Sequence, residues 1–84
     1  MLKQYNLGIM PHIIVKLWKG KSEAQKKKLA EELTQTAMSV IGYGEESFSV
    51  AIEDIDPNDW KENVYKPDIL GQNEKLYKKP GYKM

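Results

Sequence analysis

The fold is decided by residues 11–53, which read PHIIVKLWKGKSEAQKKKLAEELTQTAMSVIGYGEESFSVAIE. Two segments of this stretch, residues 13–18 and 48–53, place alternate side chains in two separate sets and are rich in apolar and β-branched residues. A period of two residues is typical of a β-strand. In the first segment both sets include large apolar residues, so we expect both faces of that strand to be covered.

A helix is expected between the two strands. Ser22 is followed three residues later by Gln25, a capping box that satisfies free backbone donors at a helix start. Apolar residues then recur at helical spacing as far as Ile41, and Gly42 suits the helix end. About 25 residues of turn and helix separate the strands, which suits a right-handed crossover between parallel strands. The predicted fold class is therefore α/β (α+β), built on one β-α-β unit.

The segment after the second strand predicts a short helix. Asp56 is placed as its N-cap and Pro57 as its first residue, and Asp59 complements the helix dipole. We expect this helix to run to about Lys66 and to be interrupted at Pro67. Residues 68–79 are expected to add another helical turn or two.

Composition limits the classes of function. The chain has 84 residues, which allows one domain with a limited core, and it has no Cys to form a disulfide or a thiolate metal site. We therefore expect subunits to share a core.

Thirteen basic and twelve acidic residues nearly cancel, which gives no electrostatic case for nucleic acid or a membrane surface as partner. Residues 1–10 lack the pattern of a secretory signal, so we expect a cytoplasmic protein.

The pair Met10-Pro11 carries the first functional hypothesis. Initiator methionine is readily removed before proline, so a chain that starts at Met10 would mature to a free prolyl amine. This secondary amine is a base, and an apolar pocket would lower its pKa toward neutrality, where a general base works best. On this hypothesis residues 1–10 are an extension absent from the active form, and residues 11–84 are a single domain. The alternative is that Pro11 only begins a strand, where proline is tolerated.

Several features of the sequence, taken together with their order and spacing, resemble the 4-oxalocrotonate tautomerase family. They are Pro11 at the head of an alternating strand, the turn at residues 20–22, the helix start at residues 22–26 and the strand at residues 48–53. The ending KKPGY, residues 78–82, resembles a bacterial subgroup with a longer C-terminal segment. The resemblance implies a keto–enol tautomerase of 2-hydroxydienoates or arylenolpyruvates with Pro11 as general base and without cofactor or metal. It also implies self-association, as a dimer in this subgroup and as a hexamer in shorter members.

The resemblance extends to substrate-binding positions, with departures. Where family members have an arginine after the first strand, this chain has Lys21, which keeps the cation but loses the planar fork that grips a carboxylate. A second arginine is replaced by Ser49, which supplies no charge. The aromatic residue after the second strand is Trp60, which would form a wall of the pocket. A monoacid with an aryl or alkenyl tail is therefore expected rather than a dicarboxylate.

Each of these positions also has a purely structural interpretation. Lys21 would be a solvated turn residue, Ser49 a half-buried strand residue, and Trp60 a core or interface aromatic. His12, the one histidine, either lines the pocket or is a structural strand residue, and by itself it forms no histidine-based metal cluster. The second hypothesis is accordingly a catalytically silent tautomerase-fold protein that binds a small molecule or acts in assembly. The two hypotheses differ in whether the Pro11 nitrogen is a free amine or part of a peptide bond to Met10.

Overall fold

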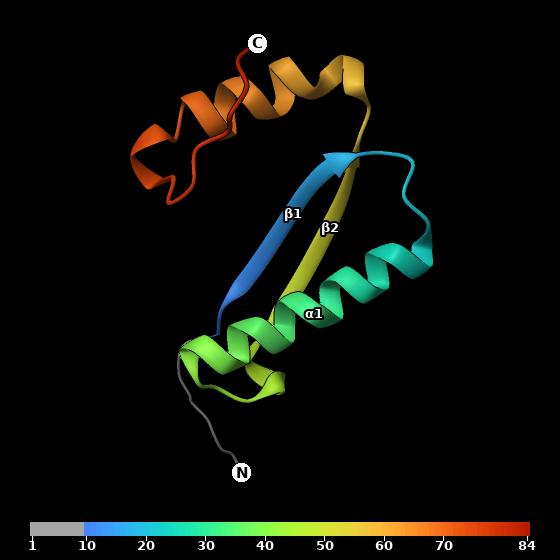
Figure 1. Cartoon of the computed structure of the whole chain (residues 1–84), viewed down its shortest axis with the longest axis vertical. Helices are drawn as coiled ribbons and strands as arrows, with labels where there is room; N and C mark the ends of the chain where they lie inside the picture. Colours follow the sequence, from blue (N-terminus) through green and yellow to red (C-terminus); the bar gives the residue numbers. More distant parts are fainter. Residues whose placement is uncertain (1–9) are drawn as a thin grey trace.

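The computed structural model describes residues 10–84 and contains one β-α-β unit followed by a helical C-terminal segment (Figure 1). The two strands lie side by side, α1 runs along them, and the C-terminal segment crosses near their carboxyl ends. In chain order the elements are β1 (His12–Trp18), α1 (Glu23–Ile41), η2 (Glu45–Ser47), β2 (Ser49–Ile55), η3 (Pro57–Asp59), η4 (Lys61–Leu70) and η5 (Asn73–Lys75).

The two strands pair in parallel, as their long connection predicts. The register runs from His12 opposite Ser49 to Trp18 opposite Ile55, so paired residues share one face of the sheet. Side chains of α1 form a hollow with Phe48 and Val50, which places the helix on the face that includes Val50 and its partner Ile13. The opposite face carries His12, Ser49, Ile14, Ala51, Lys16, Glu53, Trp18 and Ile55.

Helix α1 begins and ends where its local sequence predicts. The Ser22 hydroxyl accepts a hydrogen bond from the Gln25 backbone N–H at 3.1 Å, and the Ser22 N–H donates to the Gln25 side chain at 3.0 Å. At the other end Gly42 adopts a left-handed conformation with φ of 103°, and its N–H donates to the Met38 carbonyl. A residue with a Cβ is strained at that φ, which explains the glycine.

The expected interruption at Pro67 is wrong. Asp56 caps η3 by accepting a hydrogen bond from the Asn58 N–H, as predicted, but η4 continues through Pro67 to Leu70. This helix is a π-helix, in which the Gly71 N–H donates to the carbonyl of Lys66 five residues earlier. A proline ring clashes with the carbonyl four residues before it in an α-helix, and the wider π-helical coil relieves that clash.

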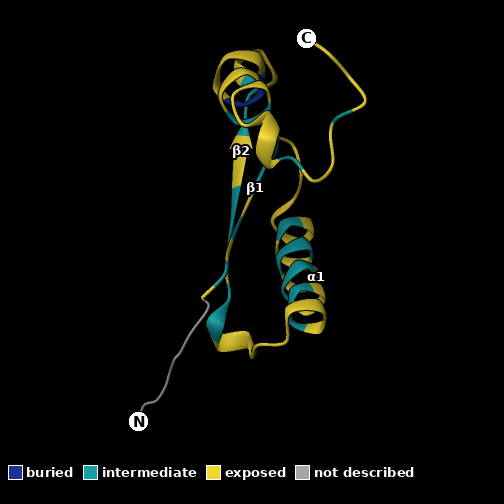
Figure 2. Cartoon of the chain, turned by 90° about the vertical axis from the view of Figure 1, so that its left-hand side faces the viewer, coloured by how far each residue is buried: buried dark blue, intermediate teal, exposed yellow. Residues whose placement is uncertain are grey.

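The single chain buries little. Among residues 10–84 only Val64 and Tyr65, both on η4, are buried, with relative exposures of 4% and 5%. Every residue of β1, β2 and α1 is exposed or half-buried (Figure 2). The Cα radius of gyration is 15.3 Å, whereas a compact domain of this length has about 12 Å. Large apolar residues therefore stay exposed on the face of the sheet opposite α1, including Ile14 at 53% and Trp18 at 54%. We term this face the open face, although η4 reaches it where Asp68 pairs with Lys16.

None of the helices over residues 10–84 combines the length and apolar character that a membrane crossing requires.

Candidate active site

Pro11 lies at the head of β1 and is half-buried. Its carbonyl accepts a hydrogen bond from the Ser49 N–H at 3.2 Å, which fixes this residue to the start of β2. The preceding residue, Met10, is exposed and has a φ of 51°. Left-handed backbone costs a non-glycine residue about 1–2 kcal/mol, so the chain is strained where it enters Pro11. Residues 1–9 of the predicted extension lie outside the described residues.

His12 and Ser49 form a polar pair beside Pro11. The two residues are opposite each other in the parallel register, and the His12 Nδ1 lies 2.6 Å from the Ser49 Oγ. Both side chains are exposed on the face of the sheet opposite α1. Depending on the imidazole tautomer, either atom donates in this hydrogen bond. The pair therefore presents hydrogen-bonding groups beside Pro11, at the Ser49 position where members of the resembled family have an arginine.

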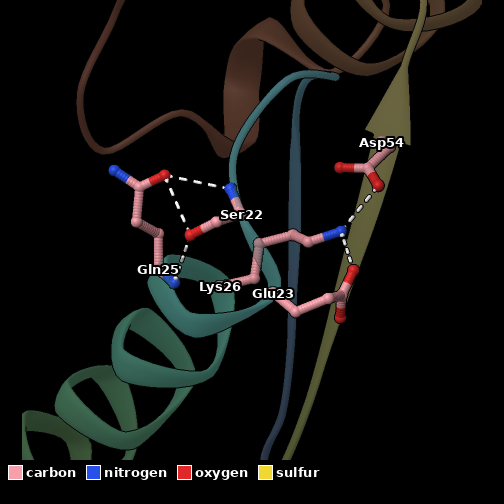
Figure 3. Close-up of polar contacts among 5 residues, drawn as sticks. All are labelled: Ser22, Glu23, Gln25, Lys26 and Asp54. Atoms are coloured by element: carbon pink, nitrogen blue, oxygen red, sulfur yellow. Dashed lines mark hydrogen bonds and ion pairs between the residues drawn. The ribbon is translucent and has the colours of Figure 1, made fainter.

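Lys21 is exposed in the turn between β1 and α1, and neighbouring contacts fix that turn (Figure 3). Ser22 and Gln25 form the capping box, while the Lys26 ammonium bridges Asp54 of β2 at 2.7 Å and Glu23 at 2.9 Å. The hydrogen bond to Asp54 and then that to Glu23 raise the pKa of Lys26 above its ordinary value. The start of α1 is thus tied to β2, which holds the Lys21 backbone at one end of the sheet.

A second ion pair closes the same end of the sheet. The Lys19 N–H donates to the Ile55 carbonyl at 3.0 Å, and the Lys19 ammonium lies 2.8 Å from a carboxylate oxygen of Asp56. Hydrogen bonds from Lys19 and from the Asn58 N–H lower the pKa of the Asp56 carboxyl. Asp56 therefore serves as the η3 cap and as the partner of Lys19 at once.

Trp60 also lies at this end and lines an apolar hollow, which we term the aromatic recess. Its indole N–H donates to the Tyr82 hydroxyl at 3.2 Å, and the Tyr82 ring centroid lies 5.8 Å from that of the buried Tyr65. The recess has a volume of about 520 Å³ and is lined by Leu17, Trp18, Trp60, Tyr82 and Met84. The sequence hypothesis named Trp60 but missed the rest of the lining, because Tyr82 and Met84 reach it only through the fold.

The candidate residues fall into two groups at opposite ends of the sheet. Pro11, His12 and Ser49 lie together at the amino ends of the strands, whereas Lys21 and Trp60 follow the carboxyl ends. Trp18 follows Pro11 by seven residues, a span of about 23 Å at the usual rise of a strand. A small substrate therefore cannot touch both groups within one subunit.

No group of three side chains among residues 10–84 is arranged to hold a metal ion. Glu53, Asp54 and Asp56 are close in sequence, but Asp54 pairs with Lys26 and Asp56 with Lys19.

Comparisons with known proteins agree with this architecture. A sequence model of the tautomerase family, described as tautomerase enzyme, matches residues 11–62. A Xylella fastidiosa protein named "Probable tautomerase" is 48% identical over 73 residues, which cover 87% of this chain and 89% of that protein. Tautomerase PptA of Cronobacter sakazakii is 42% identical over 76 residues, which cover 89% of this chain and all of that protein.

Solved structures give the same result. TomN, a 4-oxalocrotonate tautomerase homologue in the tomaymycin biosynthetic pathway, aligns with a TM-score of 0.58 and 34% identity, covering 60% of this chain and 77% of TomN. A 4-oxalocrotonate tautomerase isozyme from Methylibium petroleiphilum aligns with a TM-score of 0.58 and 32% identity, covering 60% and 81% of the two chains. The β-α-β unit with its head proline, the family match and the full-length relatives together show that this chain belongs to the tautomerase family.

Proposed function

We propose that this protein interconverts the enol and keto forms of a 2-hydroxydienoate or arylenolpyruvate-type acid, with the amine of a processed Pro11 as general base. The amine nitrogen takes a proton from the enol hydroxyl or a carbon, and the resulting prolyl ammonium returns a proton to another carbon. Atoms and charge balance without a cofactor, since one proton leaves the substrate and one is returned.

The observation that carries the proposal is the position of Pro11. It opens β1, it is half-buried, and its carbonyl is anchored to Ser49, so its nitrogen has a fixed place at the sheet end. The left-handed Met10 before it fits the same proposal, because removing the chain up to Met10 removes the backbone strain along with the acyl group. An acylated nitrogen has its lone pair delocalised into the peptide bond and is no base.

Substrate binding is proposed to need a second subunit. The cation of Lys21 and the ring of Trp60 lie at the far end of the sheet from Pro11, so an antiparallel neighbour would bring them to it. The exposed apolar side chains Ile14 and Trp18 on the open face of the sheet support such an association. Lys21 would then hold the single carboxylate of the acid, and the hydrogen-bonded His12–Ser49 pair would lie beside the reacting atoms.

The test compares two forms of the purified protein, one that begins at Pro11 and the full 84-residue chain. The processed form should tautomerise an arylenolpyruvate, with a rate that rises with pH as the ammonium loses its proton and then levels off. The full chain should be inactive. Equal activity of both forms would exclude Pro11 as the base. Inactivity of both across a panel of enol acids would favour the alternative, a catalytically silent binding or assembly module.

A further inference from the structure

We propose that the processed amino terminus, Pro11-His12, binds one Cu²⁺ ion per subunit, and that the bound ion removes the prolyl nitrogen from catalysis. Three nitrogen atoms hold the ion: the Pro11 amine, the His12 backbone nitrogen and the His12 Nδ1. The site rests on the removal of residues 1–10, which the proposed function also requires, but it does not rest on the tautomerase reaction itself.

The covalent structure of this dipeptide fixes the size of the chelate rings. Two carbon atoms separate the Pro11 amine from the His12 backbone nitrogen, and three carbon atoms separate that nitrogen from the His12 Nδ1. A metal ion therefore closes a five-membered and a six-membered ring that share the backbone nitrogen. Fused rings of this size place the three nitrogen atoms in one plane with the ion. Planar nitrogen coordination is typical of Cu²⁺, whereas Zn²⁺ sites are almost always tetrahedral.

The backbone nitrogen of His12 faces away from β2. The peptide bond between Pro11 and His12 is trans, which directs its C=O and its N–H in opposite directions. The Pro11 carbonyl accepts from the Ser49 N–H at 3.2 Å, so the His12 N–H lies toward the outer edge of β1. Within residues 10–84 the sheet has only two strands, and β2 occupies the other edge of β1. The nitrogen that the metal needs is therefore unused by the sheet, and the hydrogen bond that anchors Pro11 survives when this nitrogen loses its proton.

The His12 and Pro11 rings can both turn toward the ion. His12 is exposed, and its Nδ1 is hydrogen-bonded to the Ser49 Oγ at 2.6 Å. Rotation about the Cα–Cβ bond of His12 gives up this hydrogen bond and brings Nδ1 toward the outer edge of β1. The Pro11 ring is the first group of the processed chain, so it turns about its own Cα–C bond without moving the strand. Ser49 thus competes with the metal for Nδ1.

Few other groups of the chain compete for this ion. His12 is the one histidine of the sequence, which also has no Cys. No three side chains among residues 10–84 are arranged to hold a metal ion, whereas the proposed site takes two of its three ligands from the backbone. The unprocessed chain begins Met1-Leu2-Lys3, which has no imidazole beside its terminal amine. Processing therefore creates the base and the copper site in the same step.

Copper binding is an exchange of protons for the ion. The Pro11 amine gives the ion the lone pair that would accept the proton of the substrate, and the His12 backbone nitrogen releases its proton to solvent. The His12 Nδ1 binds as part of the neutral imidazole. The ion keeps its oxidation state, so no oxidant or reductant takes part. Because an amine that is bound to a metal cannot take up a proton, copper and catalysis exclude each other at Pro11.

The experiment titrates Cu²⁺ into the protein that begins at Pro11, at neutral pH and with glycine as a competing chelator. This form keeps every strand and helix of the structure, since the first element starts at His12. We expect one ion per subunit, a visible d–d absorption band, and an electron paramagnetic resonance spectrum with splitting from three nitrogen atoms. An equal concentration of Zn²⁺ should not displace the copper. The full 84-residue chain is the matched control, because it has the same imidazole but an acylated Pro11, and it should lack this spectrum.

Two variants of the processed protein should change the copper affinity in opposite directions. His12→Gln removes the six-membered ring and should weaken binding at least about a hundred-fold, the upper end of the loss that follows removal of a group beyond the ligands themselves. Ser49→Ala frees the His12 Nδ1 from its hydrogen bond and should tighten binding about two- to ten-fold, the value of one net hydrogen bond. Circular dichroism and sedimentation establish that both variants are folded and associated as the wild type is.

Binding and activity are measured separately, so the two proposals stand or fall apart. The same dissociation constant for copper in the processed wild type and in either His12→Gln or the full chain would overturn the site, even in a protein that is an active tautomerase. Copper binding with the expected spectrum in a protein without tautomerase activity would support the site and refute the proposed function. With both in place, one equivalent of Cu²⁺ should abolish tautomerisation and a chelator such as EDTA should restore it. Full activity of the copper-loaded protein would overturn the exclusion at Pro11.

Discussion

Mixing two inactive forms of the subunit should restore activity if Pro11 and Lys21 act in one site from different chains. The first form is the full 84-residue chain, whose Pro11 nitrogen is acylated and whose Lys21 is native. The second form begins at Pro11 and carries Lys21→Glu, which places a negative charge where the substrate carboxylate would bind. Each form alone should be nearly inactive, the first for lack of a base and the second through charge repulsion.

The expected recovery follows from the length of β1 and from two-fold symmetry. Pro11 is about 23 Å from Trp18, so a site that contains both Pro11 and Lys21 must draw them from two subunits. In a symmetric dimer each mixed pair then has one site with both native groups and one site with both defects. Random pairing of equal amounts makes half of the dimers mixed, so about a quarter of all sites become native.

The assay is the tautomerisation rate of an arylenolpyruvate after the two forms are unfolded together and refolded. A sample in which the forms are refolded separately and then combined without dissociation is the control, and intact-complex mass spectrometry measures the mixed fraction. We expect about a quarter of the activity of the processed wild type. No recovery in a sample that contains mixed dimers would refute a site shared between subunits. Full activity of the processed Lys21→Glu form by itself would place Lys21 outside the site.

Three further predictions address binding and stability. Lys21→Ala in the processed protein should raise KM for an anionic substrate, by up to about ten-fold for one lost charge-assisted hydrogen bond, and unchanged kcat/KM would exclude the role. Ser22→Ala should lower the free energy of unfolding in urea by about 1 kcal/mol through loss of the helix cap, whereas Ser39→Ala, at an exposed position inside α1, should not. The pKa of Asp56 is lowered in the folded state, so its contribution to stability is present above the unfolded value of 3.8 and is lost as the pH falls through the folded pKa. Asp56→Asn should therefore be less stable than wild type at neutral pH, and the difference should shrink as the pH falls below 3.8, through the lowered pKa of Asp56 in the folded state.

The parts of the fold that depend on local chemistry could be predicted from the sequence. Ser22 and Gln25 are three residues apart, and the φ of 103° at Gly42 is a local backbone preference, so the bounds of α1 followed from short patterns. The parallel pairing followed from connection length, since a tight hairpin cannot contain a helix. Pro67 was misjudged because its effect was taken from α-helical geometry, whereas η4 takes the wider π-helical coil.

Features that depend on distant pairs could not be predicted in this way. The Trp60–Tyr82 hydrogen bond joins residues 22 apart, and the ion pair between Lys16 and Asp68 joins residues 52 apart. Neither pair has a spacing or charge pattern that marks it in the chain. The aromatic recess was therefore absent from the sequence hypothesis, although one of its walls, Trp60, was placed in the pocket by family resemblance.

Contacts between distant residues also explain a difference in the candidate site. The sequence hypothesis assigns the candidate residues to one site, whereas the structure places them in two groups. Resemblance assigns roles to positions along a chain, and it is silent on which copy of the chain supplies each position. The parallel register then puts Pro11, His12 and Ser49 at one end of the sheet and the turn with Lys21 at the other. Both β1 and β2 leave apolar side chains uncovered, and no residue of either strand is buried. The surface on which a second chain would bring the two groups of candidate residues together is therefore the same apolar surface that the single chain leaves uncovered. The proposed second subunit, placed across this face of the sheet, would both cover these apolar side chains and bring Lys21 of one chain toward Pro11 of the other.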